Sequence, residues 1–191
     1  MSKKLLSEIR NCTFCKVQLP HSPKPILNFS SKSKIIIIGQ APGIKAHESG
    51  IPWHDASGDR LRAWLGVSID EFYDPENFAI VPMGFCYPGK GNNGDLPPRP
   101  ECASLWMDKI IASLKHKQLT LLIGQYSQNY FLNDITKRTL TERVKHYQEY
   151  LPDYVVLPHP SPRNNIWLKK HPWFMKHNLP MLQKTIRSIL Q

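Results

Sequence analysis

The stretch KIIIIGQAPGIKAHESGIPWHD, residues 34–55, contains the pattern that decides the fold. Its four consecutive isoleucines at 35–38 show no alternation of apolar and polar residues, which predicts a strand buried on both faces. The small-residue turn GQAPG follows directly, and a tryptophan, two histidines and two acidic residues lie just beyond it. The stretch therefore predicts a buried strand whose end carries side chains suited to chemistry.

Three further apolar runs have the same character, namely FAIVPM at 78–83, LTLLIG at 119–124 and DYVVLP at 153–158. Segments typical of helices separate the runs and are long enough to cross from one strand to the next: 58–66, 100–116 and 139–151. A last helix is expected at 171–191, interrupted at Pro180. The pattern predicts an α/β fold with a central, mostly parallel four-stranded sheet.

Composition sets broad limits on the class of protein. The chain has 191 residues, of which 41% are hydrophobic, so we expect a single domain over residues 1–191. Its 25 Lys and Arg residues outnumber 15 acidic residues, which fits either a polyanionic partner or ordinary solubility charge. No apolar run is long enough for a signal peptide or membrane span. We therefore expect a cytoplasmic protein, monomeric and without a membrane partner.

Polar residues follow each predicted strand: GQAPG, GFC, GQYS and HPSPRNN, in chain order. The carboxyl ends of strands in an open parallel sheet share one crevice, so we predict the active site there. Gln40 offers a hydrogen-bond donor and acceptor, and His159 lies on a turn stiffened by prolines. Taken singly, GQAPG also fits a generic strand-to-helix turn, and a lone histidine is often structural.

The GxxPG turn after the first strand, paired with HPSP after the last, resembles the uracil-DNA glycosylase superfamily over nearly the whole chain. This resemblance implies a three-layer α/β/α sandwich. It also implies hydrolysis of the N-glycosidic bond of uracil, or of another damaged or deaminated base, flipped out of DNA during base excision repair. DNA, single- or double-stranded, is the implied partner.

The resemblance extends to the four cysteines. Cys12, Cys15, Cys86 and Cys102 follow the spacing of the superfamily's iron–sulfur branch, which implies a structural [4Fe–4S] cluster held by their thiolates. The residues alone suit zinc as well, and four unconnected buried cysteines are a further alternative. A zinc hydrolase is disfavoured, because four thiolates would close the coordination shell.

The resemblance also assigns roles at the crevice. Trp53, in GIPW, is the ring expected to stack on the flipped base, and His159 is expected to stabilise the departing base. Further base contacts are expected from the first turn, from the end of the second strand and from the segment after the third: Gly39, Gln40, Ala41, Pro42, Met83, Gly84 and Gln125. Contacts to DNA are expected from Ser161, Pro162, Arg163 and Asn164. A core tryptophan is the alternative for Trp53.

The chain departs from the family pattern at the catalytic acid. The iron–sulfur branch has glutamate where this chain has Gln40, and another branch has aspartate where this chain has Ala41. Asp55, two residues past Trp53, is the candidate carboxylate, and a third branch draws its aspartate from this region. Asp55 could instead cap a helix or be solvated, with Asp59 or Glu48 in its place.

A second departure concerns base recognition. The asparagine that reads uracil in the iron–sulfur branch is replaced by Pro82, so the preferred base stays open, with hypoxanthine or a modified pyrimidine as alternatives. Asn92 or Asn93 could read a base edge instead. The missing acids also favour an alternative function, in which a catalytically weak or inactive member binds damaged or single-stranded DNA.

Overall fold

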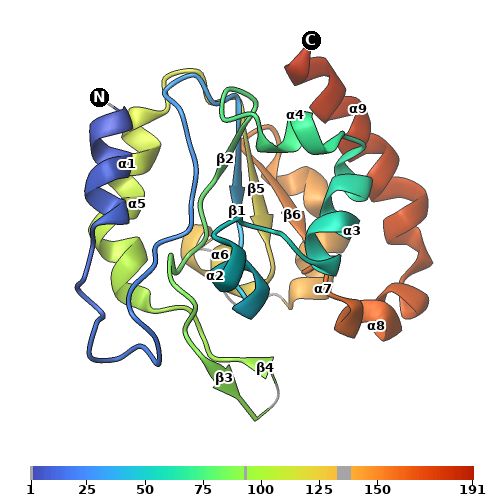
Figure 1. Cartoon of the computed structure of the whole chain (residues 1–191). Coiled ribbons are helices and arrows are strands. Elements are labelled where there is room, and N and C mark those ends of the chain that lie inside the picture. The colour runs from blue at the N-terminus through green and yellow to red at the C-terminus, as the bar shows by residue number, and fades with distance from the viewer. Residues whose placement is uncertain (1, 93, 133–138) are drawn as a thin grey trace.

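A central sheet of four parallel strands organises the molecule (Figure 1). The computed structural model describes residues 2–92, 94–132 and 139–191. The strand order is β2 (Phe78–Ile80), β1 (Ile35–Ile38), β5 (Leu119–Ile123) and β6 (Tyr154–Leu157). All three strand pairings are parallel. The predicted α/β class and the four strands read from the apolar runs are confirmed.

The isoleucine run forms a central strand because it packs on both faces. Ile36 and Ile38 belong to one hydrophobic cluster, while Ile35 and Ile37 belong to the other, and each is at most 1% exposed. Successive side chains of β1 point into one apolar layer and then into the other, so every position of the strand is buried and apolar. The absence of alternation in the sequence thus reflects burial between two layers of helices.

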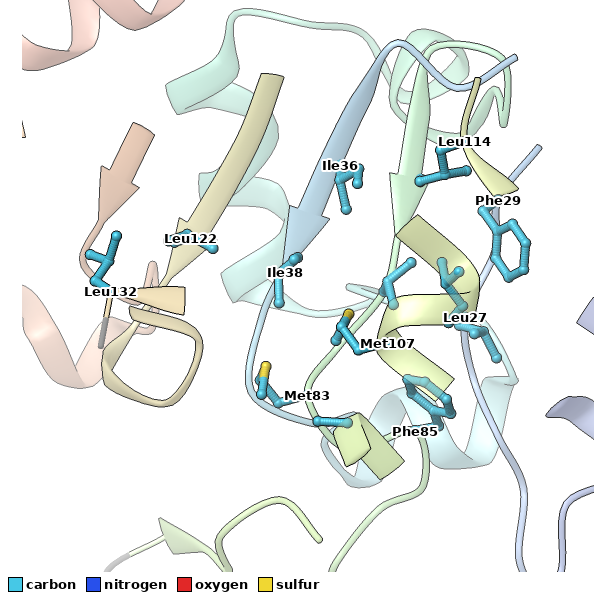
Figure 2. Packing of buried hydrophobic residues seen from close by; sticks show 14 of the residues in the cluster. Leu27, Phe29, Ile36, Ile38, Met83, Phe85, Met107, Leu114, Leu122 and Leu132 are labelled. Carbon is cyan, nitrogen blue, oxygen red and sulfur yellow. The ribbon is translucent and has the colours of Figure 1, made fainter. Parts of the chain in front are cut away.

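Helices cover both faces of the sheet. On one face, α1 (Ser2–Arg10) packs beside α5 (Pro100–Ser113), and Figure 2 shows part of the cluster beneath them. On the other face lie α3 (Ala56–Leu65), α4 (Ile69–Tyr73) and α9 (Leu179–Leu190). This arrangement is the predicted three-layer sandwich. In the described part of the chain, no helix is both long and apolar enough to cross a membrane.

Shorter elements lie around and beyond the carboxyl ends of the strands, and in Figure 1 the β3–β4 hairpin is the lowest of them. They are α2 (Ile44–Ser49), the hairpin of β3 (Lys90–Gly91) and β4 (Gly94–Asp95), α6 (Gln125–Phe131), α7 (Leu140–Lys145), η3 (Pro162–Asn164) and α8 (Asn165–Lys170). The turn-rich segment 87–100 therefore contains a small antiparallel hairpin.

Two predicted helices differ in detail from the structure. The helix expected at 139–151 ends at Lys145 and is followed by the 3₁₀ helix η2 (Tyr147–Tyr150). In the last segment, the π-helix η4 (Phe174–Asn178) runs directly into α9. Pro180 does not interrupt α9, because it lies in the first turn, where its missing N–H removes no helical hydrogen bond.

Candidate active site

A cavity of about 430 Å³ lies at the carboxyl ends of the strands. Gln40 after β1, Pro82 after β2 and His159 after β6 contribute to its lining, together with Trp53 and Asp55 from the loop before α3. Gly39, Ala41 and Pro42 also line it. The parallel topology therefore brings Gln40, Trp53, Asp55 and His159, which are distant in sequence, to one cavity.

Backbone hydrogen bonds beyond the end of the sheet hold the GQAPG turn. The amide of Met83 donates to the Gly39 carbonyl at 2.9 Å, and the amide of Gly84 donates to the Gln40 carbonyl at 3.0 Å. These bonds continue the β1–β2 pairing into the two loops. They fix the backbone from which the Gln40 side chain enters the cavity.

Met83 and Gly84 themselves do not line the cavity, unlike the expectation for base contacts. Their amides are used by the GQAPG turn, and Met83 is 6% exposed. Its side chain belongs to the core cluster (Figure 2). A Cβ on Gly84 would lie 2.9 Å from Pro98 Cβ, so Gly84 is enclosed by the chain. Pro82 occupies the cavity wall at this point.

Trp53 has an unusual backbone conformation. Its φ is 56°, the left-handed region that bulky residues rarely adopt, at a typical cost of about 1–3 kcal/mol. The Tyr73 hydroxyl donates to the Pro52 carbonyl at 2.9 Å, and Arg62 Nη1 donates to the Trp53 carbonyl at 3.5 Å. A Cβ on Gly58 would lie 1.7 Å from that carbonyl oxygen. The surroundings thus enforce the strained conformation.

The enforced conformation places the Trp53 ring against the strand end. A Cβ on Gly39 would lie 2.8 Å from Trp53 Cζ2, so only glycine permits this approach. The indole also faces His159, with ring centroids 5.5 Å apart and planes inclined by 31°. Trp53 packs partly on the core but presents part of its ring to the cavity.

The HPSP turn fixes the orientation and tautomer of His159. The Ser161 amide donates to His159 Nδ1 at 3.2 Å, so the neutral ring carries its proton on Nε2. Asn164 Nδ2 donates to the His159 carbonyl at 2.7 Å, and Arg60 Nη1 donates to the Ser161 carbonyl at 3.1 Å. Burial lowers the pKa of His159, and the Asp55 carboxylate acts in the opposite direction. The imidazole is therefore a neutral donor.

The residues expected to contact DNA take different positions. Ser161 and Arg163 line the cavity, whereas Asn164 lines a neighbouring cavity of about 210 Å³ and Pro162 begins η3. Arg163 turns toward the hairpin, since a Cβ on Gly94 would lie 2.2 Å from its Nη1.

The neighbouring cavity contains a further expected base contact. Gln125 lines it, together with Gln40, Tyr126 and His159, so the two cavities share part of their walls. Asn92 lines neither cavity, and Asn93 lies outside the described residues. Tyr126 reaches both cavities, although only its neighbour Gln125 was expected from the sequence.

Asp55 combines two positions that the sequence presented as alternatives. It is the N-cap of α3, and its Oδ1 accepts a hydrogen bond from the Gly58 amide at 2.9 Å. It also lines the cavity. Asp59 lies instead 2.5 Å from Arg62 Nη2, and neither Asp59 nor Glu48 lines the cavity. Asp55 is thus the carboxylate of this group that reaches the cavity.

A second carboxylate, Asp95, lines the cavity and was missed by sequence reasoning. It lies on β4, in the long segment 87–100, whose length was the only signal in the sequence. Asp95 is an exposed residue, and partial desolvation of its carboxylate raises its pKa. Arg163 and Lys90 lower this pKa, whereas Asp55 raises it.

This geometry agrees with the comparison to known protein families. The family model of the uracil DNA glycosylase superfamily matches residues 28–183. The chain belongs to the uracil DNA glycosylase superfamily. The match includes all four strands of the central sheet and every residue named above as lining the two cavities at the strand ends. Membership supports a DNA glycosylase-like function, because proteins of this superfamily act on DNA.

Two of the four cysteines lie before the superfamily match, yet all four line one small apolar cavity beside α5. The amides of Lys24 and Phe85 donate to the sulfur atoms of Cys86 and Cys102. Burial raises the pKa of Cys86 to about 11 and that of Cys102 to about 12.

Arg99 also lines the cysteine cavity. Arg99 lies beside Cys15, and its buried Nε has no acceptor among the described residues. Within those residues, no three His, Cys, Asp or Glu side chains form a group that could hold a single metal ion. The four thiols nevertheless line one common space.

Proposed function

We propose that the protein is a DNA glycosylase that hydrolyses the N-glycosidic bond of uracil, or of another damaged or deaminated base, flipped out of DNA. The observation that supports this most is the cavity in which the Trp53 ring, the neutral His159 donor and the Asp55 carboxylate meet. Enzymes that act on a base must extrude it and hold it against an aromatic surface. Superfamily membership supports the same reaction class.

The chemistry follows from the charges that develop as the bond breaks. The departing base takes the bonding electrons, and the His159 Nε2–H is oriented to donate to an oxygen of that base. The sugar becomes positive, and the Asp55 carboxylate stabilises that charge. Gln40 holds a water molecule or a base edge through its amide, because it cannot accept a proton at neutral pH.

Binding of the extruded nucleotide is assigned to the surrounding residues. Trp53 stacks on the base, and the backbone of residues 39–42 approaches it closely because the turn is built from small residues and Pro42. The HPSP turn, with Ser161, Pro162 and Arg163, contacts the DNA backbone. Asn164 supports this turn through its bond to the His159 carbonyl. We assign this activity to base excision repair.

The identity of the base is part of the proposal. Pro82 offers no side-chain amide where it lines the cavity, so a uracil edge is read by other groups. Gln40 is the amide that both cavities share, and Gln125 lies in the neighbouring one. Because Pro82 does not select uracil through a side-chain amide, we propose that the cavity accepts uracil, hypoxanthine or a modified pyrimidine.

A second candidate function is binding of damaged or single-stranded DNA without efficient excision. It is favoured by one observation, namely that Gln40 and Ala41 place no carboxylate on the GQAPG turn at the cavity. The Asp55 carboxylate distinguishes the two candidates, since excision requires it and binding does not.

We also propose that Cys12, Cys15, Cys86 and Cys102 hold a [4Fe–4S] cluster. All four cysteines line one small cavity, and four thiolates are the ligand set of a [4Fe–4S] cluster. Four thiolates also suit a closed zinc site, so iron, sulfide and zinc analysis of the purified protein distinguishes the two. The Arg99 Nε–H has no acceptor among the described residues, and it suits the sulfur atoms of such a group together with the amides of Lys24 and Phe85. The cluster would act as a structural staple in a reducing, cytoplasmic compartment.

Excision assays test the proposed activity. Purified protein is incubated with single- and double-stranded DNA that contains uracil, hypoxanthine or a modified pyrimidine, and released base and abasic sites are measured. We expect release of at least one base. His159→Ala should lower the single-turnover rate by about 10²–10³-fold with little change in DNA affinity, because the donor acts on developing charge.

The matched control is His116→Ala, which removes an exposed histidine that does not line the cavity and should leave the rate unchanged. DNA binding without release of any base from any substrate would favour the second candidate function. An unchanged rate with weakened binding in His159→Ala would contradict the role given to His159.

A further inference from the structure

The β3–β4 hairpin holds Asp95 at the cavity. Asp95 pairs with Lys90 across the hairpin, and the Leu96 amide donates to the Gly89 carbonyl at 2.8 Å. Arg163 from the HPSP turn lies against Gly94 on the other side. The position of Asp95 is therefore set by the hairpin backbone and by its contact with the turn that carries His159.

The Asp95 carboxylate faces the first turn of the site. A Cβ built on Gly43, the last residue of GQAPG, would lie 3.4 Å from Asp95 Oδ2. Among the described residues, none donates a hydrogen bond to this carboxylate. Asp55 differs, because its Oδ1 already accepts the Gly58 amide as the cap of α3. The cavity thus contains one carboxylate that also caps a helix and one that accepts no hydrogen bond from the described residues.

Building on the proposed glycosylase activity, we propose that Asp95 is the residue that accepts the proton of the attacking water. The bond between C1′ and the base nitrogen breaks, and its electron pair leaves with the base. The water oxygen forms the new bond to C1′, and one water proton passes to Asp95. The departing base regains a proton from solvent, and Asp95 returns its own proton to solvent, so the reaction consumes one water.

The electrostatic surroundings suit a base in this position. Desolvation raises the pKa of Asp95, and Asp55 from the cap of α3 raises it further. Arg163 from η3 and Lys90 from β3 lower it, and among the described residues the Tyr87 phenol also interacts with this carboxylate. A carboxylate with a raised pKa is a stronger base than an aspartate of ordinary pKa.

The two carboxylates therefore have different roles in the proposed reaction. Asp55, held by the α3 cap, stays beside His159 and stabilises positive charge on the sugar. Asp95, which lies on the hairpin, accepts the proton of the attacking water. This arrangement explains how a chain with Gln40 and Ala41 at the usual positions of the acid can still hydrolyse the bond.

Asp95→Asn tests this assignment, because it removes the basic oxygen and nearly preserves the shape. On a DNA substrate that the wild type cleaves, we expect the single-turnover rate to fall by about 10²–10⁴-fold, as for loss of a general base. DNA affinity should change by less than about threefold, since the role concerns the transition state. Asp108→Asn, an exposed aspartate on α5 outside the cavity, is the charge-matched control.

The pH profile provides a second readout. Protonated Asp95 cannot accept a proton, so the wild-type rate should fall as the pH drops through its pKa, which lies above the ordinary value of about 3.9. Asp95→Asn lacks this group, so the ratio of wild-type to variant rate should shrink toward one at low pH. Protonation of His159 affects both proteins and cancels in this ratio.

Two results would overturn the assignment. One is a rate for Asp95→Asn within about threefold of wild type while Asp55→Asn abolishes excision. The other is a ratio of rates that does not change with pH. Asp95→Glu, which keeps the carboxylate, should recover part of the rate lost in Asp95→Asn, and thermal unfolding verifies that both variants fold. Failure of the proposed function is distinct, since the wild type itself would then release no base.

Discussion

At the scale of single residues, Trp53 has a strained backbone conformation and also lines the cavity. A tryptophan with a φ of 56° is unfavourable, and three neighbours, Arg62, Tyr73 and Gly58, enforce it. Packing alone does not require this conformation, because a core tryptophan can adopt an ordinary backbone. The strain is explained if the ring must lie along Gly39 and face His159.

We therefore expect Trp53→Ala to weaken binding of DNA that carries an uncleavable analogue of the target nucleotide. Loss of the stacking surface should reduce the binding free energy by about 1–3 kcal/mol. Trp53→Phe is the control, because it keeps an aromatic face and should retain most of the affinity. Titrations by fluorescence anisotropy measure both variants. A large drop in thermal stability of Trp53→Ala, with unchanged affinity of its folded fraction, would assign Trp53 to the core instead.

At the scale of elements, α3 contacts both the loop that carries Trp53 and the HPSP turn that carries His159. Its N-cap is Asp55, its Arg60 holds the Ser161 carbonyl of the HPSP turn, and its Arg62 holds the Trp53 carbonyl. The helix thereby fixes both the aromatic wall and the histidine turn. A single short helix sets the distance between groups that are about a hundred residues apart in sequence.

The cap and the chemistry of Asp55 can be separated by two substitutions. Asparagine caps helices about as well as aspartate, so Asp55→Asn should keep the free energy of unfolding nearly unchanged and still lose excision activity. Asp55→Ala loses the cap and should lower the free energy of unfolding by about 0.5–2 kcal/mol as well. Urea unfolding and single-turnover assays measure the two effects. Full activity in Asp55→Asn would show that its charge is not required.

At the scale of the whole molecule, the cysteine cavity connects segments that the central sheet does not hold. Cys12 and Cys15 follow α1, Cys86 follows β2 and Cys102 lies on α5. Residues 11–25 contain no helix or strand. A cluster bound by all four thiolates would fasten this segment across the α1–α5 face.

Removal of the proposed cluster should therefore loosen this segment. We expect Cys12→Ser, or chelation of iron, to lower stability by about 2–4 kcal/mol, as for loss of a tightly bound ligand of the native state. Trypsin should then cut first after Lys16, which lies in this segment and precedes Val17. Iron and sulfide analysis, thermal unfolding and limited proteolysis measure these changes, with Ser22→Ala in the same segment as the control. Intact protein without bound iron and with unchanged protease resistance would contradict the cluster.

Several parts of this architecture were predictable because their causes are local. The isoleucine run at 35–38 and the three later apolar runs match the strands, since strands buried on both faces need continuous apolar residues. Convergence of Gln40 and His159 was predictable as well, because parallel strands end at one edge. The end of α7 at Lys145 was not, because no proline or glycine marks it.

The sequence by itself determined the strands, the class of the fold and the turns that carry Gln40 and His159, because apolar patterning and turn chemistry act between neighbouring residues. Only the tertiary structure decided that Asp95 enters the cavity, that Met83 and Gly84 stay outside it, and that Asp55 is both cap and cavity carboxylate. The side of a loop that faces a cavity depends on contacts between distant segments, such as Arg163 against Gly94. Contacts between distant segments produce no repeating pattern of residues, so they cannot be predicted from the sequence.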